Sequence, residues 1–444
     1  MDFDLPLPRV EAAYRFLSGD DSDERACAAI PEAACTDVPL NYTLNVANGA
    51  ATKLAEQLAS PGLVLPWLAA AMGAPAAVAA LFVPARLVGT LLPQLAVAGW
   101  VRGLPRRKGV WVGAGLTQAA LLAVLALVAT WPAPWAPWLM VGLFLAFNVA
   151  SGTGSVAFQD VMGKTIPSGR RGRLLANRAT IGGLLTLAAA ALLRAGEGEA
   201  APLQLSLALV LAAALLWAVG AGAFAATSEL PGASEGGRTM WREVGAGVTL
   251  VRRVPGFRRF LVARGLLLSI EMATPVYAWH AAQLAGGAAP DLLTHVFAVG
   301  LAGIVASPLW GRRADASSRK VMATAGACGA AAGGLALLVG WLPWRTPWLY
   351  AGVFVLAGVA EAGVRLGRKT YLVDGTPAAE RPLYTAFANT AVGVLALAGG
   401  GLGVLTDRAG AEGAIALLIA LAAAGALASW RLPEAAHMDA DSRD

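Results

Sequence analysis

The chain has 444 residues, of which 57% are hydrophobic and 14% are charged. Soluble domains carry nearer a quarter charged residues, so this composition excludes an ordinary soluble enzyme and is typical of a membrane protein. The formal net charge of +6 does not indicate a nucleic-acid partner, because the basic residues lie in short clusters between long apolar runs.

The chain begins with a polar tail, residues 1–42, in which a short amphipathic helix is expected near residues 9–17. Twelve apolar segments follow, each near the ~20 residues that a helix needs to cross a bilayer. The first contains Pro61 and Pro66, so we expect a kink there. The predicted segments are 43–71, 75–100, 110–131, 136–158, 174–194, 202–225, 258–284, 291–310, 321–342, 347–367, 383–405 and 412–430.

Two polar stretches complete the predicted organisation. Residues 226–257 separate the sixth and seventh segments and are expected to hold an amphipathic cytoplasmic helix between Arg238 and Arg253. Residues 431–444 form a second tail.

Lysine and arginine are concentrated in every second loop between the predicted segments. The opposite loops contain only Arg194, Arg345 and Arg408. Because loops rich in Lys and Arg stay in the cytoplasm, this pattern places both termini there and requires an even number of spans. We therefore expect a multi-pass protein of a bacterial-type inner membrane. A cytoplasmic tail also predicts that Cys27 and Cys35 are reduced thiols.

The sequence repeats itself at an offset of about 210 residues. The motif WPAPWAPWL, which begins at Trp131, matches WLPWRTPWL, which begins at Trp341. Six segments therefore repeat as six segments in the same orientation, which is the build of one transporter class. The repeat predicts an all-α membrane fold of two pseudo-symmetric six-helix bundles, residues 43–225 and 258–430.

The loop after the eighth segment reads GRRADASSRK and carries a recognisable signature. Here the chain resembles the major facilitator superfamily, whose signature places Gly, Asp and a basic pair at this spacing after the second helix of each half. The match departs at Ala316 and Ser318, and the first-half counterpart has Arg102 where the family has Asp. The sugar-porter and drug–proton antiporter motifs are absent, so no subfamily is assigned. The resemblance implies gating roles for Gly311, Asp315, Arg319, Lys320, Arg106 and Arg107.

Ionisable side chains at membrane depth are costly unless paired or hydrated, so each is a functional candidate. In the family resembled, helices 1, 4, 7 and 10 line a central cavity, and most of the buried charges fall on them; Arg86 lies on helix 2. Two pairs, Lys53 with Glu56 and Glu361 with Arg365, each lie on one face of a helix. For each pair, a structural ion pair and a transport role are equally supported. Glu271 stands apart from such pairing and is the best candidate for a protonatable carboxylate. The pathway candidates are Lys53, Glu56, Asn148, Arg264, Glu271, Glu361 and Arg365.

Other chemistry has little support in the sequence. His280 and His295 lie near the outer ends of the seventh and eighth segments, where lone histidines are more typical of interfacial side chains than of metal ligands. No nucleotide-binding or nucleophile motif occurs in a suitable context. We expect a small-molecule substrate, the lipid bilayer and protons as partners, a monomer, and no nucleic acid, metal ion, cofactor or catalytic residue.

These observations favour a proton-coupled secondary transporter that works by alternating access. Two alternatives stay open: a non-transporting receptor or scaffold on the same fold, and a membrane-embedded enzyme acting on lipid-linked substrates with His280 or His295 as base. The mixed charge of the candidate residues would suit a zwitterion, an anion or a polar neutral solute equally.

Overall fold

A computed structural model describes residues 7–19, 30–167, 170–195, 202–231, 240–284, 298, 301–302, 305–306, 309–310, 313, 317–342, 347–376, 381–435 and 438. Its α-helices are α1 (Leu7–Ser18), α2 (Val38–Leu58), α3 (Val64–Ala71), α4 (Ala76–Leu91), α5 (Pro93–Arg102), α6 (Lys108–Val128), α7 (Ala136–Thr165), α8 (Arg171–Ala195), α9 (Pro202–Ala225), α10 (Met240–Arg253), α11 (Pro255–Leu284), α13 (Ser318–Trp341), α14 (Pro347–Gly375), α15 (Arg381–Ala396) and α16 (Gly400–Trp430). Two short 3-10 helices, η1 (Glu32–Ala34) and η2 (Leu397–Gly399), complete the described elements.

Eight helices within these ranges are long and apolar enough to cross a membrane. Local breaks and gaps account for the difference from the twelve predicted segments. The first two segments are each divided into two helices, and most of the eighth lies outside the described residues. The last two predicted segments run together as α15, η2 and α16. Helix α16 has a kink at Gly410, whose φ of 77° is a left-handed conformation that favours glycine.

Proline explains both divided segments. The predicted kink in the first is confirmed, because α2 ends at Leu58 before Pro61 and α3 begins at Val64. Pro66 is the third residue of α3, where its missing N–H removes no helical hydrogen bond. In the second segment, α4 ends at Leu91 and Pro93 begins α5 after one intervening residue.

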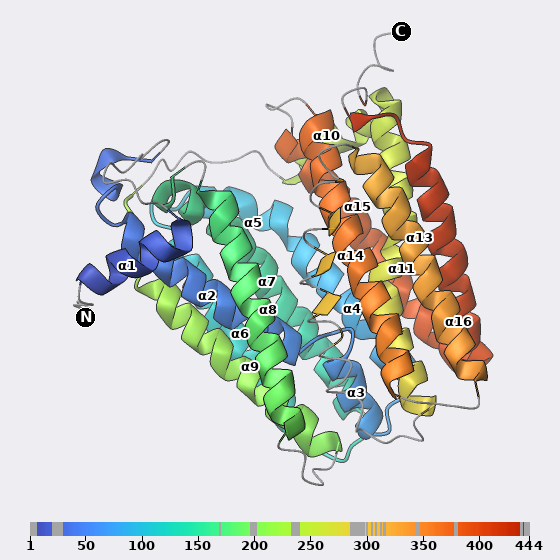
Figure 1. Ribbon diagram of the computed structural model, residues 1–444. Helices are drawn as coiled ribbons and strands as arrows, with labels where there is room; N and C mark the ends of the chain where they lie inside the picture. The colour runs from blue at the N-terminus through green and yellow to red at the C-terminus, as the bar shows by residue number, and fades with distance from the viewer. Residues whose placement is uncertain are drawn as a thin grey trace.

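The helices form two groups that lie side by side (Figure 1). In the first group α2 packs on α8 and α9, and α6 packs on α7 and α9; in the second, α13 packs on α14 and α16, and α11 packs on α16. Helix α4 joins the groups, because it packs on α7 in the first and on α11, α15 and α16 in the second. Residues of α4 therefore lie at the junction between the groups.

The tail and the linker each contain the helix that the sequence predicts. Helix α1 packs on α2, where the rings of Tyr14 and Tyr42 meet edge to face with centroids 5.4 Å apart. Helix α10 packs on α11 and α15.

The cysteine prediction is wrong at Cys35, which is disulfide-bonded, whereas Cys328 is free. The cellular compartment predicts whether cysteines are usually oxidised or reduced, but it does not predict which sulfur atoms the fold brings together. Cys27 lies outside the described residues.

Candidate functional site

Glu271 lies at the middle of α11 and faces the junction between the two groups of helices. One carboxylate oxygen is 3.4 Å from a guanidinium nitrogen of Arg86 on α4, and the other is 4.0 Å from Arg368 on α14. The glutamate side chain is only 11% exposed. The expectation of a carboxylate without a close cation is therefore wrong, because spacing along one helix does not reveal partners on other helices.

Arg264 lies two turns before Glu271 on the same helix and is almost completely buried. One of its terminal nitrogens donates a hydrogen bond to the amide oxygen of Asn389 on α15, over 2.8 Å. Its Nε has no hydrogen-bond partner, and neither has the Nε of Arg368. Asn389 and Arg368 are absent from the sequence-derived candidates, since one looks like an ordinary polar residue and the other like part of a basic loop.

Both pairs predicted within single helices are present. The Nζ atom of Lys53 is 2.6 Å from a carboxylate oxygen of Glu56, and a guanidinium nitrogen of Arg365 is 3.5 Å from Glu361. The side chains of Lys53 and Glu56 are 46% and 44% exposed. Ionised groups at membrane depth do not face lipid without a large cost, so these half-exposed side chains mark a hydrated region.

Asn148, in contrast, makes contacts that join helices. Its amide nitrogen donates to the carbonyl of Phe144 one turn earlier, and its amide oxygen accepts from the Thr90 hydroxyl of α4 over 3.3 Å. It therefore fixes α4 against α7, beside the central charges but without a direct contact to them.

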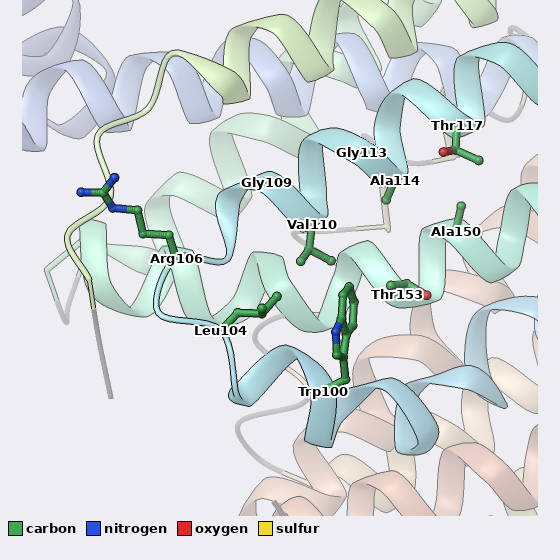
Figure 2. A pocket seen from close by; sticks show the side chains of 10 residues that line it. All are labelled: Trp100, Leu104, Arg106, Gly109, Val110, Gly113, Ala114, Thr117, Ala150 and Thr153. Carbon is green, nitrogen blue, oxygen red and sulfur yellow. The ribbon is translucent and has the colours of Figure 1, made fainter. Parts of the chain in front are cut away.

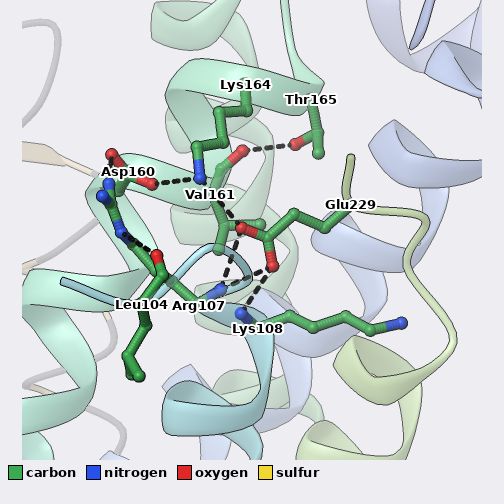
Figure 3. A network of polar contacts seen from close by, with 8 residues as sticks. All are labelled: Leu104, Arg107, Lys108, Asp160, Val161, Lys164, Thr165 and Glu229. Atoms are coloured by element: carbon green, nitrogen blue, oxygen red, sulfur yellow. Dashed lines mark hydrogen bonds and ion pairs between the residues drawn. The ribbon is translucent and has the colours of Figure 1, made fainter. Parts of the chain in front are cut away.

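A second polar network lies where α6 begins and α7 ends (Figure 3). The Glu229 carboxylate accepts the backbone N–H groups of Arg107 and Lys108, with shortest distances of 2.8 Å and 2.7 Å. The side chain of Glu229 is fully buried, and this position at a helix N-terminus favours a negative charge. Lys164 lies 3.2 Å from Glu229 and 3.0 Å from Asp160, which also pairs with Arg107.

This network gives Arg107 a definite structural partner, while Arg106 next to it is exposed to solvent. Glu229 is not among the residues that the sequence singled out. Its only signal was a carboxylate placed after a predicted helix, opposite a basic loop.

In the second group, the described part of the signature loop connects two helix ends. The Arg319 guanidinium at the start of α13 lies 2.6 Å from the Glu434 carboxylate beyond α16, and Ser317 donates to the same carboxylate over 3.0 Å. Partial burial alone would raise the pKa of Glu434, but these hydrogen bonds hold it below its ordinary value. Gly311 and Asp315 lie outside the described residues.

A lateral groove of about 470 Å³ runs between α5, α6 and α7 (Figure 2). Small residues form its floor, and a methyl group added at Gly109 or Gly113 would meet open space. Arg106 lies at one end and Trp100 at its side, but the lining contains no residue of the central charges. This groove is therefore separate from the candidate site around Glu271.

His280 is buried rather than interfacial, and its Nδ1 is 2.9 Å from the Tyr350 hydroxyl. Within the described ranges, no three His, Cys, Asp or Glu side chains come together as a metal site. His295 lies outside those ranges.

Comparison with known proteins finds a family model and a mycobacterial relative. A family model described as the Major Facilitator Superfamily matches residues 266–443. An uncharacterized protein of Mycobacterium tuberculosis (strain ATCC 25618 / H37Rv) is 28% identical over 416 residues, covering 89% of this chain and 78% of that protein.

Solved structures of transporters share the fold over most of their length. A D-xylose-proton symporter gives a TM-score of 0.66 at 14% identity, covering 89% of this chain and 98% of that one. The nucleoside transporter NupG gives a TM-score of 0.61 at 12% identity, covering 88% and 99%. The family model thus matches residues 266–443, and the fold of these transporters extends over nearly all of the chain.

Proposed function

We propose that this protein is a secondary active transporter that moves a small solute across a bacterial-type inner membrane by alternating access, with protons as the coupling ion. Residues 43–225 and 258–430 act as the two halves, and the solute binds between them near the bilayer midplane. Both termini face the cytoplasm in this proposal, as the distribution of Lys and Arg predicts.

The observation that carries the proposal is the ion pair between Arg86 and Glu271. It joins α4 of the first half to α11 of the second half, deep within the predicted spans. A buried charge pair is costly to maintain in a membrane protein and is typical of an ion or substrate pathway. Relative movement of the halves would separate the two side chains, so conformation and the protonation of Glu271 are linked.

The ends of the halves that carry the predicted outer loops are in close contact. The Asp407 carboxylate of α16 accepts the backbone N–H groups of Ala76 and Ala77 at the start of α4, over 3.1 Å and 3.3 Å. A methyl group added to Gly403 would lie 2.3 Å from the Ala77 Cα atom. Such close packing supports a conformation that is closed on the outer side.

Transport can be tested in proteoliposomes that contain the purified protein and a trapped pH-sensitive dye. The probes are a panel of simple carboxylates, inorganic phosphate, sugars, nucleosides and amino acids. At least one probe should cause proton influx and accumulate against its gradient, and a protonophore should abolish the accumulation. A folded protein that moves none of these solutes would support the receptor or scaffold alternative instead.

A further inference from the structure

We propose that the solute is a small oxyanion, carrying a carboxylate or phosphate group, and that Arg264 and Arg368 bind it beside Glu271. This inference rests on the proposed transport function and adds the substrate class to it. It follows from the balance of charge, from unpartnered hydrogen-bond donors and from the exposure of the surrounding ionised groups.

The balance of charge around Glu271 is positive within the described residues. Arg86 and Arg368 lie 3.4 Å and 4.0 Å from this one carboxylate, and Arg264 lies two turns before it on α11. The other two carboxylates of the central region, Glu56 and Glu361, are each engaged by a cation of their own helix. Three guanidinium groups therefore share one negative charge, and the low-dielectric surroundings make that excess costly until an anion joins them.

The donors that an anion would use are visible at the same place. Arg264 is 3% exposed and lies two turns before Glu271 on α11, while Arg368 on α14 is 4.0 Å from the Glu271 carboxylate. The Nε–H groups of both arginines lack a hydrogen-bond partner. Buried polar groups in folded proteins are nearly always hydrogen-bonded, so an exception at this position indicates a missing partner. The planar guanidinium fork matches the two oxygens of a carboxylate or phosphate.

The cluster is accessible from a hydrated region. Lys53, Glu56 and Arg365 are about half exposed, although they lie within predicted spans. Lys369 on α14 is exposed as well. A positive potential on the path to the cluster attracts anions and repels cations.

Neutral and zwitterionic solutes fit these observations less well. A neutral solute would leave the excess positive charge uncompensated. A zwitterion would need a free carboxylate for its cationic group, and all three carboxylates of the region already have cationic partners. The charge distribution thus resolves the choice that the sequence left open.

Thermal unfolding of the purified full-length protein, at constant ionic strength, tests the substrate class. The probes are acetate, lactate, succinate and inorganic phosphate, compared with xylose and choline. One oxyanion or more should raise the unfolding temperature in a saturable manner, because a ligand of the folded state stabilises it. The comparison of carboxylates with phosphate identifies which oxyanion is bound.

Variants connect the binding to the two arginines. Arg264→Gln and Arg368→Gln should each weaken oxyanion binding by roughly ten- to hundredfold, the range expected for losing a hydrogen bond to a charged group. Arg264→Lys keeps the charge but not the fork, and should weaken binding by about tenfold at least. Arg252→Gln, on the exposed face of α10, removes the same charge and should bind as the parent does.

The outcomes separate this inference from the proposed function. If xylose or choline stabilises the protein and crosses the membrane while no oxyanion does either, the oxyanion proposal is overturned and transport stands. If an oxyanion binds through Arg264 but is not moved in proteoliposomes, the binding site stands and the transport function fails. Should Arg264→Gln not fold, the Arg264→Lys and Arg368→Gln affinities decide, and unchanged affinity in both overturns the proposal.

Discussion

At the scale of single residues, the two buried carboxylates Glu271 and Glu229 have different surroundings and different expected roles. Glu271 contacts side-chain cations from two other helices, across the junction of the halves. Glu229 accepts backbone N–H groups at the start of α6, within one half. The first set of contacts must change when the halves move, whereas the second set can remain intact.

Glu271→Gln should abolish proton-driven accumulation and leave downhill exchange largely intact. Glutamine keeps the shape and one acceptor oxygen for Arg86, but it cannot take up or release a proton at working pH. The measurement compares uptake under an imposed pH gradient with exchange in preloaded proteoliposomes. A variant that still accumulates the solute with the parent's pH dependence would exclude Glu271 as the coupling residue, and Glu56 and Glu361 would be tested next.

Glu229→Ala should lower the free energy of unfolding by roughly 3 kcal/mol, since breaking a buried charge pair leaves its partners unsatisfied. Lys164 and the N–H groups at the start of α6 would lose their acceptor. Thermal unfolding of purified protein measures the change. Glu32→Ala is the matched control because Glu32 is exposed, and an equal loss of stability in both variants would contradict the role of Glu229.

At the scale of elements, the predictable features are those with a local cause. Pro61 divides the first span at the expected place because proline cannot continue the helical hydrogen bonds. The linker helix α10 follows from its amphipathic pattern. The Arg86–Glu271 and Arg264–Asn389 contacts were not predictable, because each joins helices that are far apart in the sequence.

Gly403 is the element-scale feature with the clearest test. Because its Cα–H faces the backbone of Ala77, Gly403→Val should prevent α16 from closing on α4 and should favour an outward-open conformation. The measurement is the rate at which a membrane-impermeant maleimide labels a single cysteine at Ala80, in a background without native cysteines. We expect an increase of at least about tenfold.

The control for this experiment lies on the same helix. A side chain at Gly401 would meet no atom within 4 Å, so Gly401→Val should label at the parent's rate. Equal labelling in the two valine variants would mean that the contact between α16 and α4 does not govern outer access.

The link between α13 and the end of α16 makes a pH-dependent prediction. The folded protein holds the pKa of Glu434 below its ordinary value, so the ionised form stabilises the fold above that ordinary value, and the contribution is lost as pH falls through the folded pKa. The parent should therefore unfold at a higher temperature than Glu434→Gln at neutral pH, and the two should converge in acid, once the pH is below the folded pKa. A difference that persists in acid would show that charge is not its cause.

At the scale of the whole molecule, the internal repeat and the alternation of loop charge predicted an all-α fold of two halves, and the GRRADASSRK motif supplied the resemblance to the superfamily. The repeat and the charge pattern are periodic along the chain, so a single sequence is enough to detect them. The selectivity of the site was not predictable, because it depends on which charges the two halves bring together. Lys53 and Glu56 looked like free cavity charges of both signs, yet they neutralise each other, and the excess that remains is positive.

The last prediction concerns how the whole molecule is inserted. Both termini should face the cytoplasm, because the loops on that side hold nearly all the Lys and Arg, and moving such loops across the membrane is unfavourable. The disulfide at Cys35 argues for an oxidising environment at the first tail, so the N-terminus needs its own measurement. Paired reporters, one active only in the periplasm and one only in the cytoplasm, are fused before Met1, within residues 196–200 and after Asp444. We expect cytoplasmic activity at both termini and periplasmic activity at the middle site, which lies in a predicted outer loop. Periplasmic activity at the C-terminus alone would require an odd number of spans and would refute the two equal halves. Reversed activity at all three sites would be consistent with the same fold inserted in the opposite orientation.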